Sequence, residues 1–371
     1  MNPVVSTTES SVIPIIDCDI HPTANSRPVG PYIPAAYQEA MRQGMGSQPG
    51  QGYMNPFGVQ RRDAECDDPR QAASDLFDRY GIAYGVLQPP GISVSLSTNI
   101  DVGTAKAQAW NDWQIAEWLD ADDRFLGSIC VNMNDAPAAA REIRRVKAAH
   151  PRMVQVISCG ESSDLYGHRR YFPVYEACQE LGLPFALHPG AEGALHSSTP
   201  VGRPSNYFEW HTGIPITYQG HLISMVTEGV FELLPGLKFV LVEGGMAWLA
   251  HTMWRLDKNF KALRSLTPWL KRAPSEYIVE NVRLTTQPME EPNDPRHLLQ
   301  MLDMIHAERT VCFASDFPHW DFDDPRRVFP KTIDPTLLRR IFYDNAAELY
   351  HLPSMEETQR RMALPRAAAK G

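Results

Sequence analysis

The sequence predicts an α/β fold, a distorted (β/α)8 TIM barrel with inserted loops, and three observations favour it. Apolar runs of strand length alternate with longer segments of helical periodicity from about residue 70 onward, which is typical of parallel β/α units. Eight such runs favour a closed barrel over an open doubly wound sheet. Neither common glycine-rich phosphate loop follows an early strand, which argues against a nucleotide-binding fold.

The predicted elements follow in chain order. The first strand is the apolar run 12–16, and a helix is expected at 33–42. Each later unit pairs helical periodicity with the apolar strand after it. The pairs are 71–80 with 82–87, 104–119 with 125–131, 137–149 with 153–158, 172–181 with 184–188, 218–233 with 237–242, 247–263 and 275–279 with 282–286, and 296–307 with 310–314. Pro137 suits the first turn of its helix, because N–H groups in the first turn have no acceptor within the helix and the missing N–H of proline costs no hydrogen bond.

We expect one barrel domain over residues 12–352, with a flexible N-terminus at 1–11 and a C-terminal tail at 353–371. Irregular sequence interrupts the domain in an insertion at about 22–69 and again at 191–215. Long irregular loops in compact domains often form lids or binding loops. A disordered insertion is the alternative for the first of them.

Composition describes an ordinary globular protein. Hydrophobic residues make up 43% of the 371 residues and the net charge is -9, without a basic cluster beyond one helix face, so nucleic acid is not an expected partner. The six cysteines show no close pairing and are expected to be reduced core residues. No secretion signal or membrane-spanning run is apparent, so we expect a cytoplasmic protein without a membrane partner.

Metal-capable side chains follow several predicted strands. Barrels of this kind carry their active sites at the carboxyl ends of the strands, and alternate residues of a strand share one face. The candidates are Asp17, Asp19 and His21 at strand one, His188 at strand five, Glu243 and Gln287 after strands six and seven, and Asp316 and His319 after strand eight. Carboxylates and imidazoles at one rim suit a divalent cation. Each residue taken singly could instead be structural.

These positions lie in segments that resemble the amidohydrolase-related group of the amidohydrolase superfamily, which includes metal-dependent hydrolases and decarboxylases of aromatic and unsaturated acids. The segments are Ile-Asp-Cys-Asp-Ile-His, Leu-His-Pro-Gly, Phe-Val-Leu-Val-Glu-Gly-Gly, Phe-Ala-Ser-Asp-Phe-Pro-His-Trp-Asp and Asp-Asn-Ala-Ala-Glu-Leu-Tyr, between residue 15 and about 352. The resemblance implies one divalent metal ion, Zn or Mn. The ligands it implies are Asp19, His21, His188 and Asp316.

One departure from the family's pattern bears on the reaction. Decarboxylases of this group usually have a histidine after strand six, where this chain has Glu243. The departure favours a hydrolase, in which metal-bound water attacks a small cyclic or aromatic substrate, with Asp316, Glu243 and His319 as catalytic residues. Glu243 could act as a base, pair with Arg255 or His251, or reach the metal.

Two other functions stay open. The same metal could support non-oxidative decarboxylation of an aromatic or unsaturated carboxylic acid, or the barrel could bind a metabolite without catalysis. Aromatic loop residues suit a small ring-bearing substrate. They are Tyr207, Trp210, His211 and Trp320, while Arg61 and Arg62 could contact a substrate carboxylate. Relatives in this group are commonly homodimers, and the tryptophan-rich helix around Trp110 is a candidate interface.

Overall fold

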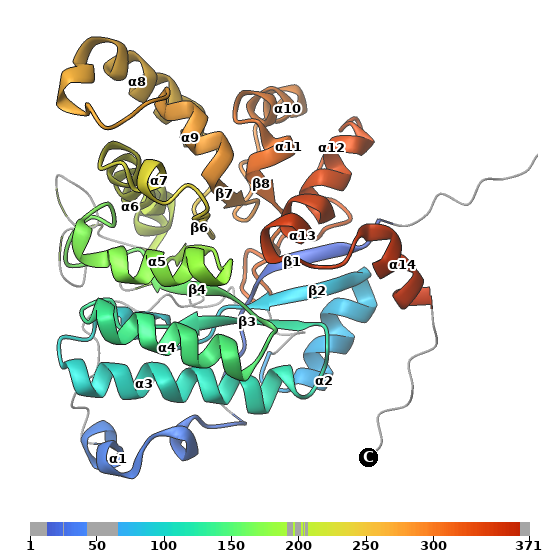
Figure 1. The fold of residues 1–371 in the computed structure, drawn as a ribbon. Coiled ribbons are helices and arrows are strands. Elements are labelled where there is room, and N and C mark those ends of the chain that lie inside the picture. The colour runs from blue at the N-terminus through green and yellow to red at the C-terminus, as the bar shows by residue number, and fades with distance from the viewer. Residues whose placement is uncertain are drawn as a thin grey trace, which may run out of the picture.

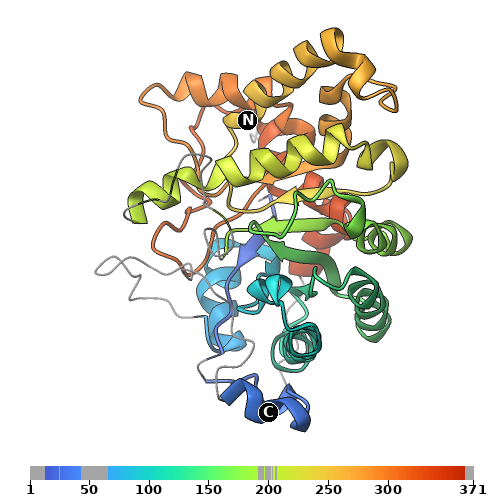
Figure 2. The same cartoon turned by 90° about the vertical axis from the view of Figure 1, so that its left-hand side faces the viewer.

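The computed structural model describes residues 13–24, 26–42, 66–190, 196, 202, 204 and 207–363. In these residues eight strands form one sheet in the order β1 to β8, and neighbouring strands are parallel. The helices lie around the outside of the sheet (Figures 1 and 2). The strands are β1 (Ile15–Ile20), β2 (Ile82–Leu87), β3 (Phe125–Cys130), β4 (Met153–Cys159), β5 (Phe185–His188), β6 (Phe239–Leu241), β7 (Val282–Thr285) and β8 (Val311–Cys312). The predicted eight-unit β/α architecture is confirmed.

Backbone contacts join the last strand to the first. The N–H of Cys18 donates to the carbonyl oxygen of Phe313 at 3.0 Å, and the N–H of His21 donates to that of Phe317 at 2.8 Å. A parallel bridge also pairs Ile20 with Phe317. The chain after β8 therefore runs beside β1, so residues at opposite ends of the sequence meet at one rim.

The predicted helices are found, with shifted bounds, and α11 to α14 are additional helices that were not predicted from the sequence. The helices are α1 (Ala35–Arg42), α2 (Pro69–Ala72), α3 (Ile100–Trp113), α4 (Ala136–Ala149), α5 (Phe172–Leu181), α6 (Tyr207–Thr227), α7 (Val230–Leu233), α8 (Trp248–Leu263), α9 (Pro274–Asn281), α10 (Pro295–Met304), α11 (Ala307–Thr310), α12 (Pro335–Arg339), α13 (Asn345–Tyr350) and α14 (Met355–Ala363). No helix in the described part of the chain is long and apolar enough to cross a membrane.

Two of the shifted boundaries bear on the site. The first strand begins at Ile15 rather than at residue 12, so Asp17 and Asp19 lie inside β1 and not after it. Helix α6 begins at Tyr207 and continues through Pro215. A proline inside a helix removes one backbone hydrogen bond and normally ends or kinks the helix, which is why the sequence indicated a loop as far as residue 215.

Other predictions can be placed on the structure. The predicted tail contains α14, whose Met355 and Thr358 are buried. Trp113 and Trp118 are fully buried within the chain, so they cannot form the suggested subunit interface, and the homodimer stays a prediction. All six cysteines are buried and none forms a disulfide, as expected. Residues 1–11, the stretch 44–60 with Arg61 and Arg62, and most of 191–206 lie outside the described residues.

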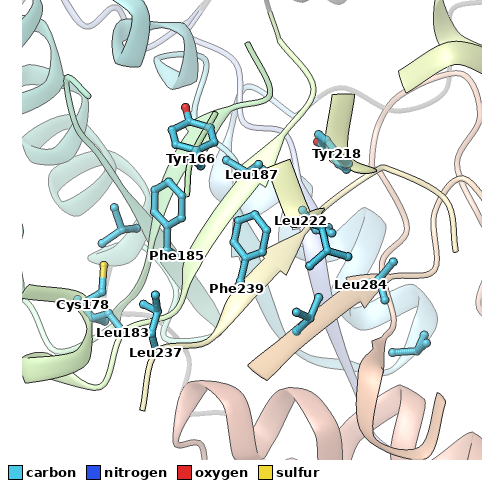
Figure 3. Close-up of a cluster of buried hydrophobic side chains, with 14 of the residues drawn as sticks. Tyr166, Cys178, Leu183, Phe185, Leu187, Tyr218, Leu222, Leu237, Phe239 and Leu284 are labelled. Atoms are coloured by element: carbon cyan, nitrogen blue, oxygen red, sulfur yellow. The ribbon is translucent and has the colours of Figure 1, made fainter. Parts of the chain in front are cut away.

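Aromatic packing outside the barrel fixes the strands that lead into the site. Figure 3 shows Phe185 of β5 beside Phe239 of β6, and their rings stack with centroids 6.0 Å apart and planes 9° from parallel. Tyr218 and Leu222 of α6 belong to the same buried cluster. Such aromatic pairs stabilise a fold by about 0.5–1.5 kcal/mol beyond the area they bury. This packing holds β5 and β6 in place, and the rim residues follow directly after these two strands.

Candidate metal centre

Two aspartates of β1 share a face but have different partners. Asp17 and Asp19 lie two positions apart and are both fully buried. Asp17 accepts hydrogen bonds from the N–H of Asp19 (3.1 Å), the N–H of Ser315 (3.0 Å) and the hydroxyl of Ser315 (2.5 Å). Asp17 thus links β1 to the segment after β8. Asp19 faces the other predicted ligands.

Four side chains from β1, β5 and the end of β6 converge at the rim. Nε2 of His188 lies 3.0 Å from Oε2 of Glu243 and 3.6 Å from Oδ1 of Asp19. Nε2 of His21 lies 3.1 Å from the same Asp19 oxygen and 3.3 Å from Nε2 of His188. One donor atom from each of the four lies within 4.8 Å of all the others. We call Asp19, His21, His188 and Glu243 the four-donor group.

The chemistry of the four-donor group fits a divalent cation. In the described part of the chain, no hydrogen-bond donor is aligned with any carboxylate oxygen of Asp19 or Glu243, and both side chains are fully buried. Buried carboxylates are costly unless positive charge offsets them. Nδ1–H of His188 donates to the carbonyl oxygen of Pro189 at 2.7 Å, which leaves Nε2 as the ligand atom facing the carboxylates.

The pKa shifts in the group have the same origin. Burial disfavours the imidazolium form of His188, but the charges of Glu243 and Asp19 outweigh burial and raise the pKa of His188 to about 10. Burial also opposes ionisation of Asp19, yet His21 and His188 lower the pKa of Asp19 below its usual range. The two carboxylates therefore favour positive charge beside them, which either protons or a metal ion can supply.

Asp316 belongs to a second group with His21 and His319. Oδ1 of Asp316 lies 2.7 Å from Nδ1 of His319 and 2.9 Å from Nε2 of His21. The three residues offer donor atoms within 4.8 Å of one another. His21 is shared, so the second group adjoins the four-donor group. The structure thus brings together the predicted ligands Asp19, His21, His188 and Asp316, as well as the predicted catalytic residues Glu243 and His319.

Asp316 and His319 both favour their uncharged forms. Burial, and after it the charges of Glu243 and Asp19, raise the pKa of Asp316 well above its usual value. Burial and the neighbouring His21 lower the pKa of His319 well below its usual value. A neutral acid and a neutral base in contact can exchange one proton without creating an isolated buried charge.

Gln287 connects Asp316 to the loop after β8. Its Nε2 donates to Oδ2 of Asp316 at 3.1 Å and to Oδ2 of Asp321 at 2.9 Å. The same Asp321 oxygen lies 3.3 Å from Nε2 of His211. The sequence placed Gln287 at the rim but assigned Asp321 no role. The available signal for Asp321 was its place at the end of the Asp-Phe-Pro-His-Trp-Asp segment.

The four predicted substrate-binding residues form one aromatic group beside this connection. Tyr207 stacks on His211 with centroids 5.5 Å apart, and its hydroxyl accepts a hydrogen bond from Nε1 of Trp320 at 3.1 Å. Trp210 packs against Tyr207 at 5.6 Å. Trp210 is buried whereas Trp320 is 37% exposed. The start of α6 and the loop after β8 thus form an aromatic wall that contacts the metal centre through Asp321.

Glu243 lies at the metal centre rather than beside the helix that follows it. Its carboxylate lies against His188. His251 instead contacts Gln219, with 3.5 Å between Nδ1 of His251 and Nε2 of Gln219. An ion pair between Glu243 and a cation of the following helix therefore does not explain why this position is acidic.

Two curated proteins with similar sequences are decarboxylases. The chain is 26% identical over 294 residues to gamma-resorcylate decarboxylase of Polaromonas sp., covering 75% of this chain and 86% of that protein. It is also 26% identical over 262 residues to 2-amino-3-carboxymuconate-6-semialdehyde decarboxylase of Dictyostelium discoideum. This alignment covers 69% of this chain and 68% of that protein.

A solved structure has the same fold. It is 5-carboxyvanillate decarboxylase of Novosphingobium aromaticivorans, complexed with manganese and 4-hydroxy-3-methoxy-5-nitrobenzoic acid, with a TM-score of 0.70 and 17% identity over 92% of this chain and 97% of that one. Residues 16–352 match the family model described as Amidohydrolase. This match spans the barrel from β1 to the end of α13 and includes every residue of both donor groups. The chain therefore belongs to the amidohydrolase family.

Proposed function

We propose that this chain is a metal-dependent, non-oxidative decarboxylase of an aromatic or unsaturated carboxylic acid. The observation that carries the proposal is the buried four-donor group at the rim of a barrel whose curated relatives are decarboxylases. These relatives favour decarboxylation over the hydrolysis that the sequence suggested. The acidic residue after β6 was the reason for preferring hydrolysis, and its contact with His188 gives it another explanation.

Asp19, His21 and His188 would hold the ion, together with a carboxylate from another strand. When bound, a divalent ion supplies a Lewis acid that attracts substrate oxygens and offsets negative charge as the reaction proceeds. Oxygen and nitrogen ligands suit both Zn and Mn, and two carboxylates shift the preference toward the harder Mn.

Asp316 and His319 would supply the proton that decarboxylation requires. When the bond to the carboxylate breaks and carbon dioxide leaves, its electron pair stays on the substrate carbon, which must then gain a proton. Asp316 and His319 are in contact at 2.7 Å, and Asp316 is fully buried. The pair can hold a proton between Oδ1 and Nδ1 and deliver it where bulk water has little access.

The aromatic wall would bind the ring or the conjugated system of the substrate. Tyr207, Trp210, His211 and Trp320 contact one another and reach the metal centre through Asp321. Flat π faces favour offset or edge contacts with a planar substrate. The substrate class is therefore a small planar carboxylic acid.

The test separates carbon dioxide release from water consumption. Protein loaded with Mn²⁺ or Zn²⁺ is incubated with hydroxybenzoates and unsaturated dicarboxylates. We expect release of carbon dioxide, and in deuterium oxide one deuterium on the carbon that lost the carboxylate. His188→Ala should lower the rate by at least about 100-fold because a metal ligand is lost. A product that gains oxygen-18 from labelled water without releasing carbon dioxide would instead establish a hydrolase.

A further inference from the structure

We infer that Asp321 determines substrate specificity: its carboxylate accepts a hydrogen bond from a hydroxyl or amino group that the substrate carries on its planar system, away from the carboxylate that is lost. This inference rests on the proposed decarboxylase function and narrows its substrate class. It gives a role to a residue to which the sequence assigned none. The substrate is then a planar acid with a second polar group that donates a hydrogen bond.

Asp321 lies between the aromatic wall and the metal centre. Its Oδ2 accepts from Nε2 of Gln287 at 2.9 Å, and the same Nε2 donates to Oδ2 of Asp316 at 3.1 Å. The same Asp321 oxygen lies 3.3 Å from Nε2 of His211, whose ring stacks on Tyr207. A substrate that lies along the aromatic wall with its reacting carboxylate at the metal centre therefore passes Asp321.

Two acceptor oxygens at this position have no hydrogen-bond donor among the described residues. They are Oδ1 of Asp321 and Oε1 of Gln287, and both atoms are buried. The side chain of Asp321 is 12% exposed and Gln287 is fully buried. A buried acceptor that stays unpaired costs free energy, and a donor supplied by a ligand removes this cost. This part of the site therefore suits a ligand that brings a donor.

The other acidic residues of the same loop are directed elsewhere. Oδ2 of Asp323 accepts from the N–H of Met289 at 3.1 Å. Oδ1 of Asp324 accepts from the N–H and from Nε of Arg326, both at 2.9 Å. Of these three carboxylates, Asp321 is the one that contacts both Gln287 of the metal centre and the aromatic wall.

A carboxylate held in one orientation selects donors and rejects acceptors. Because Gln287 donates to Oδ2 of Asp321, Oδ1 is left for the substrate. A hydroxyl or amino group gains a charge-assisted hydrogen bond there, whereas a second carboxylate would meet like charge. An analogue without the donor leaves a buried oxygen unpaired, which is the strongest basis for discrimination that a binding site has.

Binding of inert probes to the metal-loaded full chain tests the inference without turnover. The probes are 2-nitrophenols, because a nitro group is planar with two oxygens like a carboxylate but cannot leave as carbon dioxide. Each carries at one further ring position either a hydroxyl group or a fluorine atom, which is similar in size but cannot donate. At one ring position we expect Mn²⁺-loaded wild type to bind the hydroxyl probe at least about 10-fold more tightly than the fluoro probe, measured by isothermal titration calorimetry.

Asp321→Asn should remove this preference. The side-chain oxygen of the variant can still accept from Gln287, which places the new NH₂ group where Oδ1 was and replaces an acceptor by a donor. The hydroxyl probe should therefore lose its advantage and bind within about threefold of the fluoro probe.

Asp323→Asn is the matched control. It makes the same change in the same loop, at a carboxylate that accepts from the backbone of Met289, and it should keep the wild-type preference for the hydroxyl probe. Thermal melts of the metal-free proteins check folding. Both variants should melt close to wild type, because each keeps an oxygen for the donor that its aspartate accepts from.

The outcomes distinguish this inference from the proposed function. If wild type binds the hydroxyl and fluoro probes equally at every ring position, or binds none of them, the inference is wrong, while carbon dioxide release still decides the function. The inference is also wrong if Asp321→Asn keeps the preference or if Asp323→Asn loses it equally. If wild type shows the preference but releases carbon dioxide from no acid, the contact with Asp321 stands and the proposed function is wrong. Because the first comparison uses wild type alone, it stays decisive if a variant fails to fold.

Discussion

Asp17 shows how a single residue can support the metal centre without facing it. It accepts three hydrogen bonds, two of them from Ser315, and so ties β1 to the chain that carries Asp316. Burial raises the pKa of Asp17 to about 7, and the Ser315 hydroxyl acts in the opposite direction. The distance between Asp19 and Asp316 therefore depends on the hydrogen bonds between their neighbours Asp17 and Ser315.

We predict strong energetic coupling between Asp17 and Ser315. Ser315→Ala should lower the free energy of unfolding by about 1–3 kcal/mol, because a buried acceptor loses a donor. In a double-mutant cycle with Asp17→Asn, followed by urea unfolding, the two changes should couple by at least about 0.5 kcal/mol. Additive effects of the two substitutions would show that the bond contributes nothing to stability.

Helix α6 is the element that joins substrate recognition to the rest of the barrel. Its first turns carry Tyr207 and His211, and its middle carries His221, which is buried. Nδ1 of His221 accepts from the N–H of Tyr166 at 3.2 Å, and Nε2–H donates to the carbonyl oxygen of Gly160 at 2.6 Å. The neutral imidazole thus fixes α6 to the loop after β4.

His221 should make this attachment sensitive to acid. Burial lowers the pKa of His221 from 6.5 to about 4. Between these values the unfolded chain binds a proton that the folded chain excludes, so stability is full above pH 6.5 and falls as the pH drops toward 4. At 1.36 kcal/mol per pKa unit, the loss is about 3 kcal/mol.

The measurement compares wild type with His221→Gln in urea at several pH values. The glutamine cannot titrate, so the stability advantage of wild type should shrink by up to about 3 kcal/mol between pH 7 and pH 4. A difference that stays constant over this range would mean that His221 does not contribute to acid unfolding.

At the scale of the whole molecule, barrel closure is what the sequence predicted best. Eight apolar runs with helices between them gave the strand count, and the carboxyl ends of those strands gave the right rim. Closure then brings Asp19 of β1 beside Asp316 after β8, although almost 300 residues separate them. Spacing along single strands could not show this proximity, but the fold class could.

Side-chain direction could not be predicted in the same way. The position of Glu243 depends on a left-handed backbone and on contacts with Tyr218 and Thr285 from other elements. The start of α6 was hidden by Pro215, and Asp321 reaches the site through its contact with Gln287. These features arise from tertiary contacts that no local pattern encodes.

The central claim is that the carboxyl ends of β1 and β5 bring Asp19, His21 and His188 to one metal ion. Anomalous diffraction at the manganese edge, from crystals grown with Mn²⁺, tests it most directly. The account predicts one peak about 2.0–2.4 Å from donor atoms of Asp19, His21 and His188. A peak bound elsewhere, or no peak among these side chains in a well-ordered crystal, would contradict the claim.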